Sequence, residues 1–204
     1  FAEHAQLTGS TEYLAQAQSL ARFMTTTQEV NGEFAVHKID GSDGSVDDFE
    51  SGYYPGEAIF ALTKLYEVDA NPAWIDSAHK GAHWLIEVRD ADVATEDLNH
   101  DHWLLYGLNE LYMNRPDEAY LTHARRITDS IVALQHNGQT GEKADWNGGY
   151  YTPPRSTPTA TRSEGLGAAY FIFTRAGDET YTATAQDVME KGLEFQLRTQ
   201  FSGR

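Results

Sequence analysis

The segment Glu57-Ala-Ile-Phe-Ala-Leu-Thr-Lys-Leu-Tyr66 decides the fold of this chain, because its pattern recurs twice. Its apolar residues follow the i, i+3, i+4, i+7 rule of a helix, and no proline interrupts the run. The pattern returns in Trp103-Leu-Leu-Tyr-Gly-Leu-Asn-Glu-Leu-Tyr112 and in Glu164-Gly-Leu-Gly-Ala-Ala-Tyr-Phe-Ile-Phe173. These segments predict three similar inner helices that are buried on all sides.

A second series of helices alternates with the first. An aromatic residue followed four positions later by Ala marks each member, at Tyr13, Trp74, Tyr120 and Tyr181. The aromatic residues are 61, 46 and 61 positions apart, and positions 57, 103 and 164 of the inner series keep the last two of these intervals. Charged residues on one side predict outer helices with a solvated face. The chain is therefore predicted to be all-α, built from tandem inner and outer helical hairpins.

This alternation resembles the six-hairpin (α/α) toroids of carbohydrate-active enzymes. The resemblance includes Tyr53-Tyr-Pro-Gly-Glu57-Ala and Thr161-Arg-Ser-Glu164-Gly, which are expected at the starts of inner helices. Unsaturated-glucuronyl hydrolases and relatives of N-acylglucosamine 2-epimerase belong to this superfamily. The resemblance implies an (α/α) toroid, or part of one, with long rim loops and a carbohydrate substrate. It holds at superfamily level, so no family's catalytic residues are transferred to this sequence.

We expect residues 1–204 to form a single α-hairpin repeat domain. Residues 1–9 are expected to be the tail of an inner helix, and an outer helix follows it. Three complete inner-outer pairs are expected after that outer helix. Six hairpins would need more helices than this. We therefore expect a domain that is incomplete at one or both ends, with further hairpins or a partner chain covering the open ends.

Composition excludes several classes of protein. The net charge of −16 opposes general binding to nucleic acid or to an anionic membrane. Hydrophobic residues make up 40% of the chain without a long apolar run, which predicts a soluble protein without a transmembrane helix; the compartment, cytoplasm or periplasm, stays open. The absence of cysteine excludes disulfides, thiolate nucleophiles and cysteine metal sites.

Three connections, at residues 25–51, 90–99 and 137–160, lead into inner helices and are longer than the turns at the opposite end. Long connections in a compact domain are usually functional, so the site is expected at the rim where inner helices begin. Two of these connections contain related phrases, Asn31-Gly-Glu-Phe34 and Asn147-Gly-Gly-Tyr150-Tyr151. Each predicts a turn and a short extended piece, and a β-hairpin packed on the rim is the preferred interpretation.

Carboxylates at the predicted helix starts are the catalytic candidates. Glycoside hydrolysis needs a protonated and an ionised carboxyl group, and Glu57, Asp101 and Glu164 could face a common cavity. Alternatively, these acids have a structural role, because acidic side chains are favoured in the first turn of a helix and residues 161–164 match a capping box. Asp101 could cap its helix. His102 is a fourth catalytic candidate, since histidine titrates near neutrality; a buried structural role is its alternative.

Aromatic side chains near these acids could cover the apolar face of a pyranose while polar groups bind its hydroxyls. Arg155 and Arg162 could hold the carboxylate of a uronic acid, or could pair with acids of this chain. The predicted substrate-binding residues are Tyr53, Tyr54, His100, Trp103, Asp145, Trp146, Tyr150, Tyr151 and Arg162.

No cofactor or metal centre is predicted. The loop Asp40-Gly-Ser-Asp43-Gly-Ser-Val-Asp47-Asp48-Phe-Glu50 could hold Ca²⁺ through its clustered oxygens, but it lacks EF-hand spacing, and a solvated acidic loop is preferred. His79 and His83 have the i, i+4 spacing of metal ligands without the Glu of a zinc protease motif, so we interpret them as surface residues.

The sequence therefore favours a carbohydrate-active enzyme, with glycoside hydrolysis first and sugar epimerisation or polysaccharide lysis second. The alternative from another class is a non-catalytic α-solenoid that binds glycan or protein. A catalytic site predicts a deep pocket with at least two carboxylates of perturbed pKa, whereas a binding module predicts a shallow aromatic groove.

Overall fold

The computed structural model describes residues 1–139 and 143–200, and these form two layers of helices. The inner layer consists of α1 (Ala2–Thr8), α3 (Tyr54–Asp69), α5 (His102–Asn114) and α7 (Ser156–Ala176). The outer layer consists of α2 (Leu14–Thr26), α4 (Pro72–Trp84), α6 (Glu118–Leu134) and α8 (Glu179–Thr199). The predicted alternation of inner and outer helices is confirmed.

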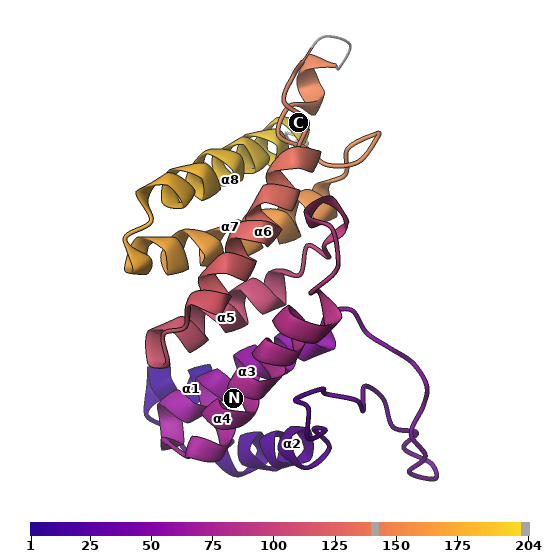
Figure 1. The fold of residues 1–204 in the computed structure, drawn as a ribbon, viewed down its shortest axis with the longest axis vertical. Helices are drawn as coiled ribbons and strands as arrows, with labels where there is room; N and C mark the ends of the chain where they lie inside the picture. Colours follow the sequence, from indigo (N-terminus) through magenta and orange to yellow (C-terminus); the bar gives the residue numbers. More distant parts are fainter. Residues whose placement is uncertain (140–142, 201–204) are drawn as a thin grey trace.

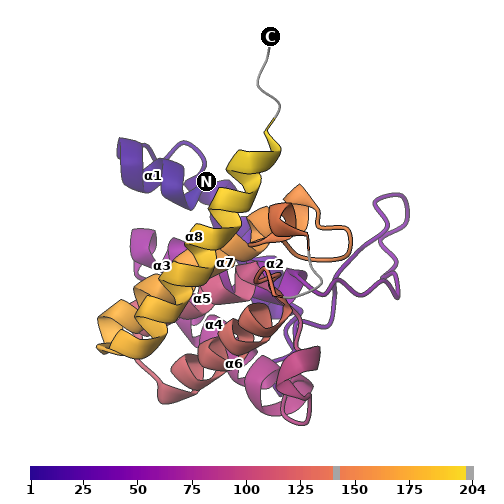
Figure 2. The same ribbon diagram turned by 90° about the horizontal axis from the view of Figure 1, so that it is seen from above.

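The inner helices pack in chain order, α1 on α3, α3 on α5 and α5 on α7. Glycines let them approach closely: a Cβ on Gly107 of α5 would lie 2.7 Å from Ile59 Cγ2 of α3, and one on Gly165 of α7 would lie 3.0 Å from Leu105 Cδ1 of α5. Figures 1 and 2 show this stack from two sides, with α2 and α8 at opposite ends of its long axis in Figure 1. The described helices make an open stack, and the closed toroid is not seen in them.

The short turns that lead into α4, α6 and α8 are built in the same way, whereas α2 follows Tyr13 without a side-chain cap. Asn71, Asp117 and Asp178 precede α4, α6 and α8, and each side chain accepts a hydrogen bond from a backbone N–H of the first turn. Such caps satisfy donors that the helix itself leaves free. The aromatic markers Trp74, Tyr120 and Tyr181 lie two residues after the start of these helices, as the repeat requires.

The long connections lie at the rim where inner helices begin. The β-hairpins expected there are not found in the described residues, and residues 25–51 contain two isolated bridges, Gln28 to Phe34 and Ile39 to Val46. The two related phrases nevertheless contact the outer helices in the same way. Gln28 Nε2 donates to the carbonyl of Gly32 and to a carbonyl of α4. Gln135 Nε2 donates to the carbonyl of Gly148 and to a carbonyl of α8. Gly32 and Gly148 both have positive φ and lie directly on the backbone of the next outer helix.

One expected boundary is wrong. The segment Thr161-Arg-Ser-Glu164 was expected to cap an inner helix, but α7 already begins at Ser156. Glu164 therefore lies in the third turn, and helix capping does not explain its presence there. Pro158 did not prevent the earlier start, because proline is tolerated in the first turn, where its missing N–H is not needed.

Buried apolar residues form one core that extends from Ala21 in α2 to Val188 in α8. Among the described residues, no helix combines the length and the apolar character that crossing a membrane requires.

Candidate active site

A pocket of about 580 Å³ opens at the rim beside the starts of α5 and α7. We call it the rim pocket; the lining residues are Tyr53, Leu98, Asn99, His100, His102, Leu134, Tyr151, Arg155, Thr157, Pro158, Thr161 and Arg162. This described lining contains two arginines and no carboxylate, although the whole chain carries a net charge of −16. The rim pocket is therefore suited to an anionic ligand.

Arg162 is held firmly at the edge of this pocket. Its Nε donates to His100 Nδ1 at 2.7 Å, and its Nη1 donates to the Pro158 carbonyl at 2.9 Å. The guanidinium lies 4.7 Å from the ring centroid of Tyr150 and 5.2 Å from that of Tyr151. In residues 1–139 and 143–200 neither Arg162 nor Arg155 forms an ion pair with a carboxylate. Neither positive charge is therefore neutralised by a carboxylate of the described chain, although the N–H groups of Arg162 already bond His100, Pro158 and Tyr151.

His100 supports Arg162. Burial, with a smaller effect of the Arg162 charge, lowers the pKa of His100 to about 4, so its ring is neutral at pH 7. Because Nδ1 accepts from Arg162, the proton lies on Nε2, which donates to Ser130 Oγ at 2.8 Å. His100 therefore positions the arginine and is not free to act as an acid.

A second group of residues lies on the neighbouring inner helices. Glu57 of α3 and Glu164 of α7 are exposed, while His102 of α5 is 9% exposed and its Nδ1 has no partner among the described residues. Burial lowers the pKa of His102, and the negative charges of Glu164 and Glu57 oppose this effect. Both carboxylates therefore act on the same imidazole, from helices on the two sides of α5.

Half-buried aromatic rings adjoin these acids. The Phe60 ring of α3 lies 6.1 Å from the ring of Trp103 and 5.5 Å from that of Tyr106, both on α5. Burial raises the pKa of Tyr106, and the charge of Glu164 raises it further. We call the six residues the inner-face cluster: Glu57, Phe60, His102, Trp103, Tyr106 and Glu164. His102 also lines the rim pocket and so joins the two regions.

Two members of the inner-face cluster were missed in the sequence. Phe60 and Tyr106 each lie one helical turn after a predicted site residue, Glu57 and Trp103. That spacing places them on the same helix face, and it was the signal that could have identified them.

Asp101 takes the structural position that the sequence allowed. It is the N-cap of α5, and its Oδ1 accepts from the Leu104 N–H at 3.1 Å. The residue is fully buried, and Oδ2 has no partner among the described residues. Burial raises the pKa of this carboxyl to about 7. Asp101 therefore lies behind the inner-face cluster, out of contact with solvent.

The remaining predicted binding residues lie in different environments. Tyr54 packs against His37 and Phe34, and Tyr150 is 2% exposed in the core, with its ring beside a smaller pocket of about 310 Å³. Asp145 and Trp146 belong to the 3₁₀ turn η3 (Ala144–Trp146), where Trp146 packs against His136. Of these four residues, Tyr150 alone lines a pocket at the rim.

The acidic loop at residues 40–50 uses its carboxylates locally. Asp40 accepts from Ser42, Asp43 accepts from Ser45, and Asp47 pairs with Lys38 at 2.5 Å. These hydrogen bonds lower the pKa of each of the three aspartates. A further pocket, apolar and about 220 Å³ in volume, lies between α1, α2 and α3 and is lined by none of the predicted site residues.

In comparisons with known proteins, no protein-family model matches the chain, and neither curated proteins nor solved structures give a significant match. Function has to be inferred from the geometry of the site.

Proposed function

We propose that this protein is a carbohydrate-active enzyme that binds an acidic saccharide across the rim pocket and the inner-face cluster. The observation that carries the proposal is that Glu57 and Glu164 are exposed on α3 and α7, the two helices that pack against α5, which carries His102 and Trp103. Paired acids beside aromatic rings are what glycoside chemistry requires.

Hydrolysis is the first candidate reaction. One of Glu57 and Glu164 would protonate the leaving oxygen, and the other would activate water or attack the anomeric carbon. Both side chains are exposed and come from packed helices, so they could reach opposite sides of a bound glycosidic bond. Trp103 and Tyr106 would cover the apolar face of the sugar ring.

The acidic character of the substrate is inferred from Arg155 and Arg162. Each guanidinium stacks on the ring of Tyr151, at 4.5 and 5.2 Å from its centroid, and neither has a carboxylate partner in the described chain. A guanidinium matches a carboxylate through two parallel hydrogen bonds. A uronic acid residue fits this arrangement better than a neutral sugar does.

Elimination or epimerisation next to a uronate carboxylate is the second candidate. A specific observation favours it: His102 has a lowered pKa, and Nδ1 of its ring has no partner among the described residues. A neutral imidazole can remove a proton from the carbon next to a carboxylate that arginine neutralises. In this case His102, and not the two glutamates, would be the essential residue.

Incubation with uronate-containing oligosaccharides, and with neutral ones in parallel, tests these proposals. Hydrolysis yields new reducing ends without unsaturation, whereas lysis yields a conjugated double bond that absorbs ultraviolet light. Glu57→Gln and Glu164→Gln are each expected to reduce hydrolysis by about 100-fold or more, the usual size of a general acid or base contribution. Glu12→Gln, at an exposed position in the turn between α1 and α2, is the matched control and should retain full activity.

The other outcomes separate the alternatives. If a His102→Gln variant loses activity while both glutamate variants stay active, the reaction is elimination or epimerisation and not hydrolysis. Binding without turnover, weakened in Arg155→Gln, would identify a glycan-binding module. Failure to bind either acidic or neutral saccharides would contradict the carbohydrate proposal.

A further inference from the structure

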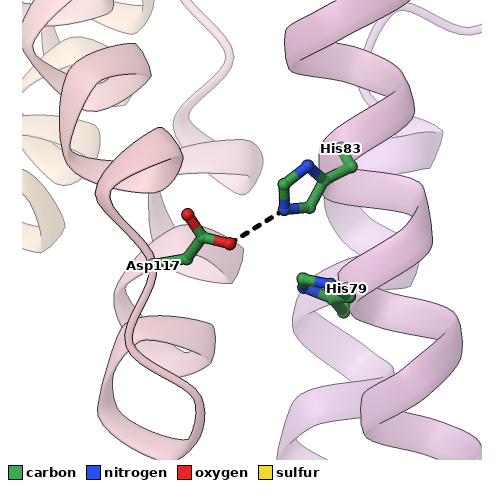
Figure 3. A group of neighbouring side chains, drawn as sticks. All are labelled: His79, His83 and Asp117. Carbon is green, nitrogen blue, oxygen red and sulfur yellow. Dashed lines mark hydrogen bonds and ion pairs between the residues drawn. The ribbon is translucent and has the colours of Figure 1, made fainter.

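A cluster of three possible metal ligands lies in the outer layer, away from the rim pocket. His79 and His83 are one turn apart on α4, with ring centroids 4.5 Å apart, and both face Asp117 at the start of α6 (Figure 3). One donor atom of each residue lies within 4.8 Å of the other two. All three side chains are half-buried, so the histidines interpreted as surface residues are partly enclosed between α4 and α6.

Other side chains already orient both rings. His83 Nδ1 lies 2.7 Å from Glu87 Oε1, and His79 Nδ1 lies 2.5 Å from the Tyr120 hydroxyl. Histidines that bind a metal through one nitrogen commonly hydrogen-bond through the other, which fixes the ring and its tautomer. In His83 the other nitrogen, Nε2, faces Asp117, so a bound ion would replace the contact between that nitrogen and the carboxylate.

Asp117 supplies a carboxylate oxygen on the opposite side. Its Oδ1 accepts from the Ala119 N–H and caps α6, which leaves Oδ2 to face α4. Oδ2 lies 3.0 Å from His83 Nε2. In a tetrahedral zinc site with bonds of about 2.0–2.2 Å, donor atoms lie roughly 3.3–3.6 Å apart. Small rotations of half-buried side chains therefore suffice to form such a site.

We propose that His79, His83 and Asp117 bind a divalent transition metal, with zinc as the best match. Two imidazoles and one carboxylate form a ligand set that zinc accepts, with the fourth position left to water. Calcium and magnesium prefer ligand sets made of oxygen alone. The ion would join α4 to the start of α6 and so fasten neighbouring repeats together.

Isothermal titration of the metal-free 204-residue chain with ZnCl₂ tests the proposal. We expect one zinc ion per chain and a rise in Tm at saturating zinc, because an ion that binds only the folded state stabilises it. Co²⁺ bound in zinc's place should show the visible absorption of tetrahedral coordination. His83→Gln and Asp117→Asn should each weaken zinc binding at least tenfold. Asp117→Asn keeps a good helix cap, so it removes the charged ligand with little effect on folding.

Two further variants complete the test. Glu87→Gln removes the carboxylate behind His83 and should weaken zinc binding about 10- to 100-fold, as loss of such outer contacts does. His4→Gln, at an exposed histidine of α1, should leave zinc binding unchanged. Unchanged affinity in both His83→Gln and Asp117→Asn, or no zinc-dependent rise in Tm, would overturn the proposal. The cluster would then be a hydrogen-bonded contact between α4 and α6.

Discussion

Asp101 combines two features that favour opposite protonation states. Its cap bond from the Leu104 N–H favours the carboxylate, whereas complete burial favours the neutral acid. Burial has the larger effect and raises the pKa of this carboxyl to about 7, from its ordinary value of 3.8. The folded state therefore binds a proton more tightly than the unfolded state does. This contribution to stability is complete below about pH 4 and declines as the pH rises through 7.

Replacing Asp101 with Asn should make the stability of the protein less dependent on pH. Asn caps helices as well as Asp does, but it has no charge to bury. We expect Asp101→Asn to be more stable than the wild type at pH 8, and to gain less at pH 5. Urea unfolding at the two pH values measures this. A wild-type stability that does not fall between pH 5 and 8 relative to the variant would contradict the assignment.

At the scale of the helices, the inner layer depends on glycines at the contacts. A Cβ added to Gly56 of α3 would lie 2.5 Å from the Leu104 nitrogen and 2.8 Å from Asp101 Oδ2. The obstructing atoms include backbone of α5, which cannot move aside as the end of a side chain can. This contact also brings the start of α3, with Glu57, close to the start of α5.

Gly56→Ala is therefore expected to destabilise the protein although Ala is the better helix former. We expect a loss of about 1–3 kcal/mol in the free energy of unfolding, the usual cost of overpacking. Gly167→Ala on α7 is the matched control, since its Cβ would meet only Met189 Sδ, at 3.8 Å. That variant should gain about 0.5–1 kcal/mol from helix propensity. Chemical denaturation of both variants distinguishes them, and equal effects would show that the inner helices are less closely packed.

At the scale of the whole molecule, the stack of hairpins is extended. The accessible surface is 11032 Å², whereas a compact monomer of this mass, 22.8 kDa, exposes about 9,600 Å². Figure 1 shows the reason, because the hairpins follow one another along one axis without closing. Among the described residues, the main contacts between inner helices join neighbours in the stack, α1 with α3, α3 with α5 and α5 with α7.

Small-angle X-ray scattering should report this shape. A compact domain of this length has a radius of gyration of about 17 Å, and we expect a larger value for the monomer. A dilution series identifies any contribution from self-association. A value at or below that of the compact domain would mean that the stack folds back on itself in solution.

The sequence by itself determined the secondary structure and its order. Periodic apolar residues and aromatic markers are local signals, so the inner and outer helices, their short capped turns and the long connections at one rim could all be predicted. The N-cap role of Asp101 could also be predicted, because helix capping depends on a few neighbouring residues. The error at the start of α7 arose where two local signals competed, a capping-box pattern at Thr161 and an earlier start at Ser156.

Only the tertiary structure decided which predicted residues come together. Exposure separated Glu57 and Glu164 from the buried Asp101, although the sequence allowed all three to face a common cavity. The pairing of His79 and His83 with Asp117 depends on how α4 packs beside α6. Contacts of this kind join residues far apart in the chain, and local periodicity carries no information about them. The packing of helix on helix fixes those distances, and with them the chemistry that the surface can perform.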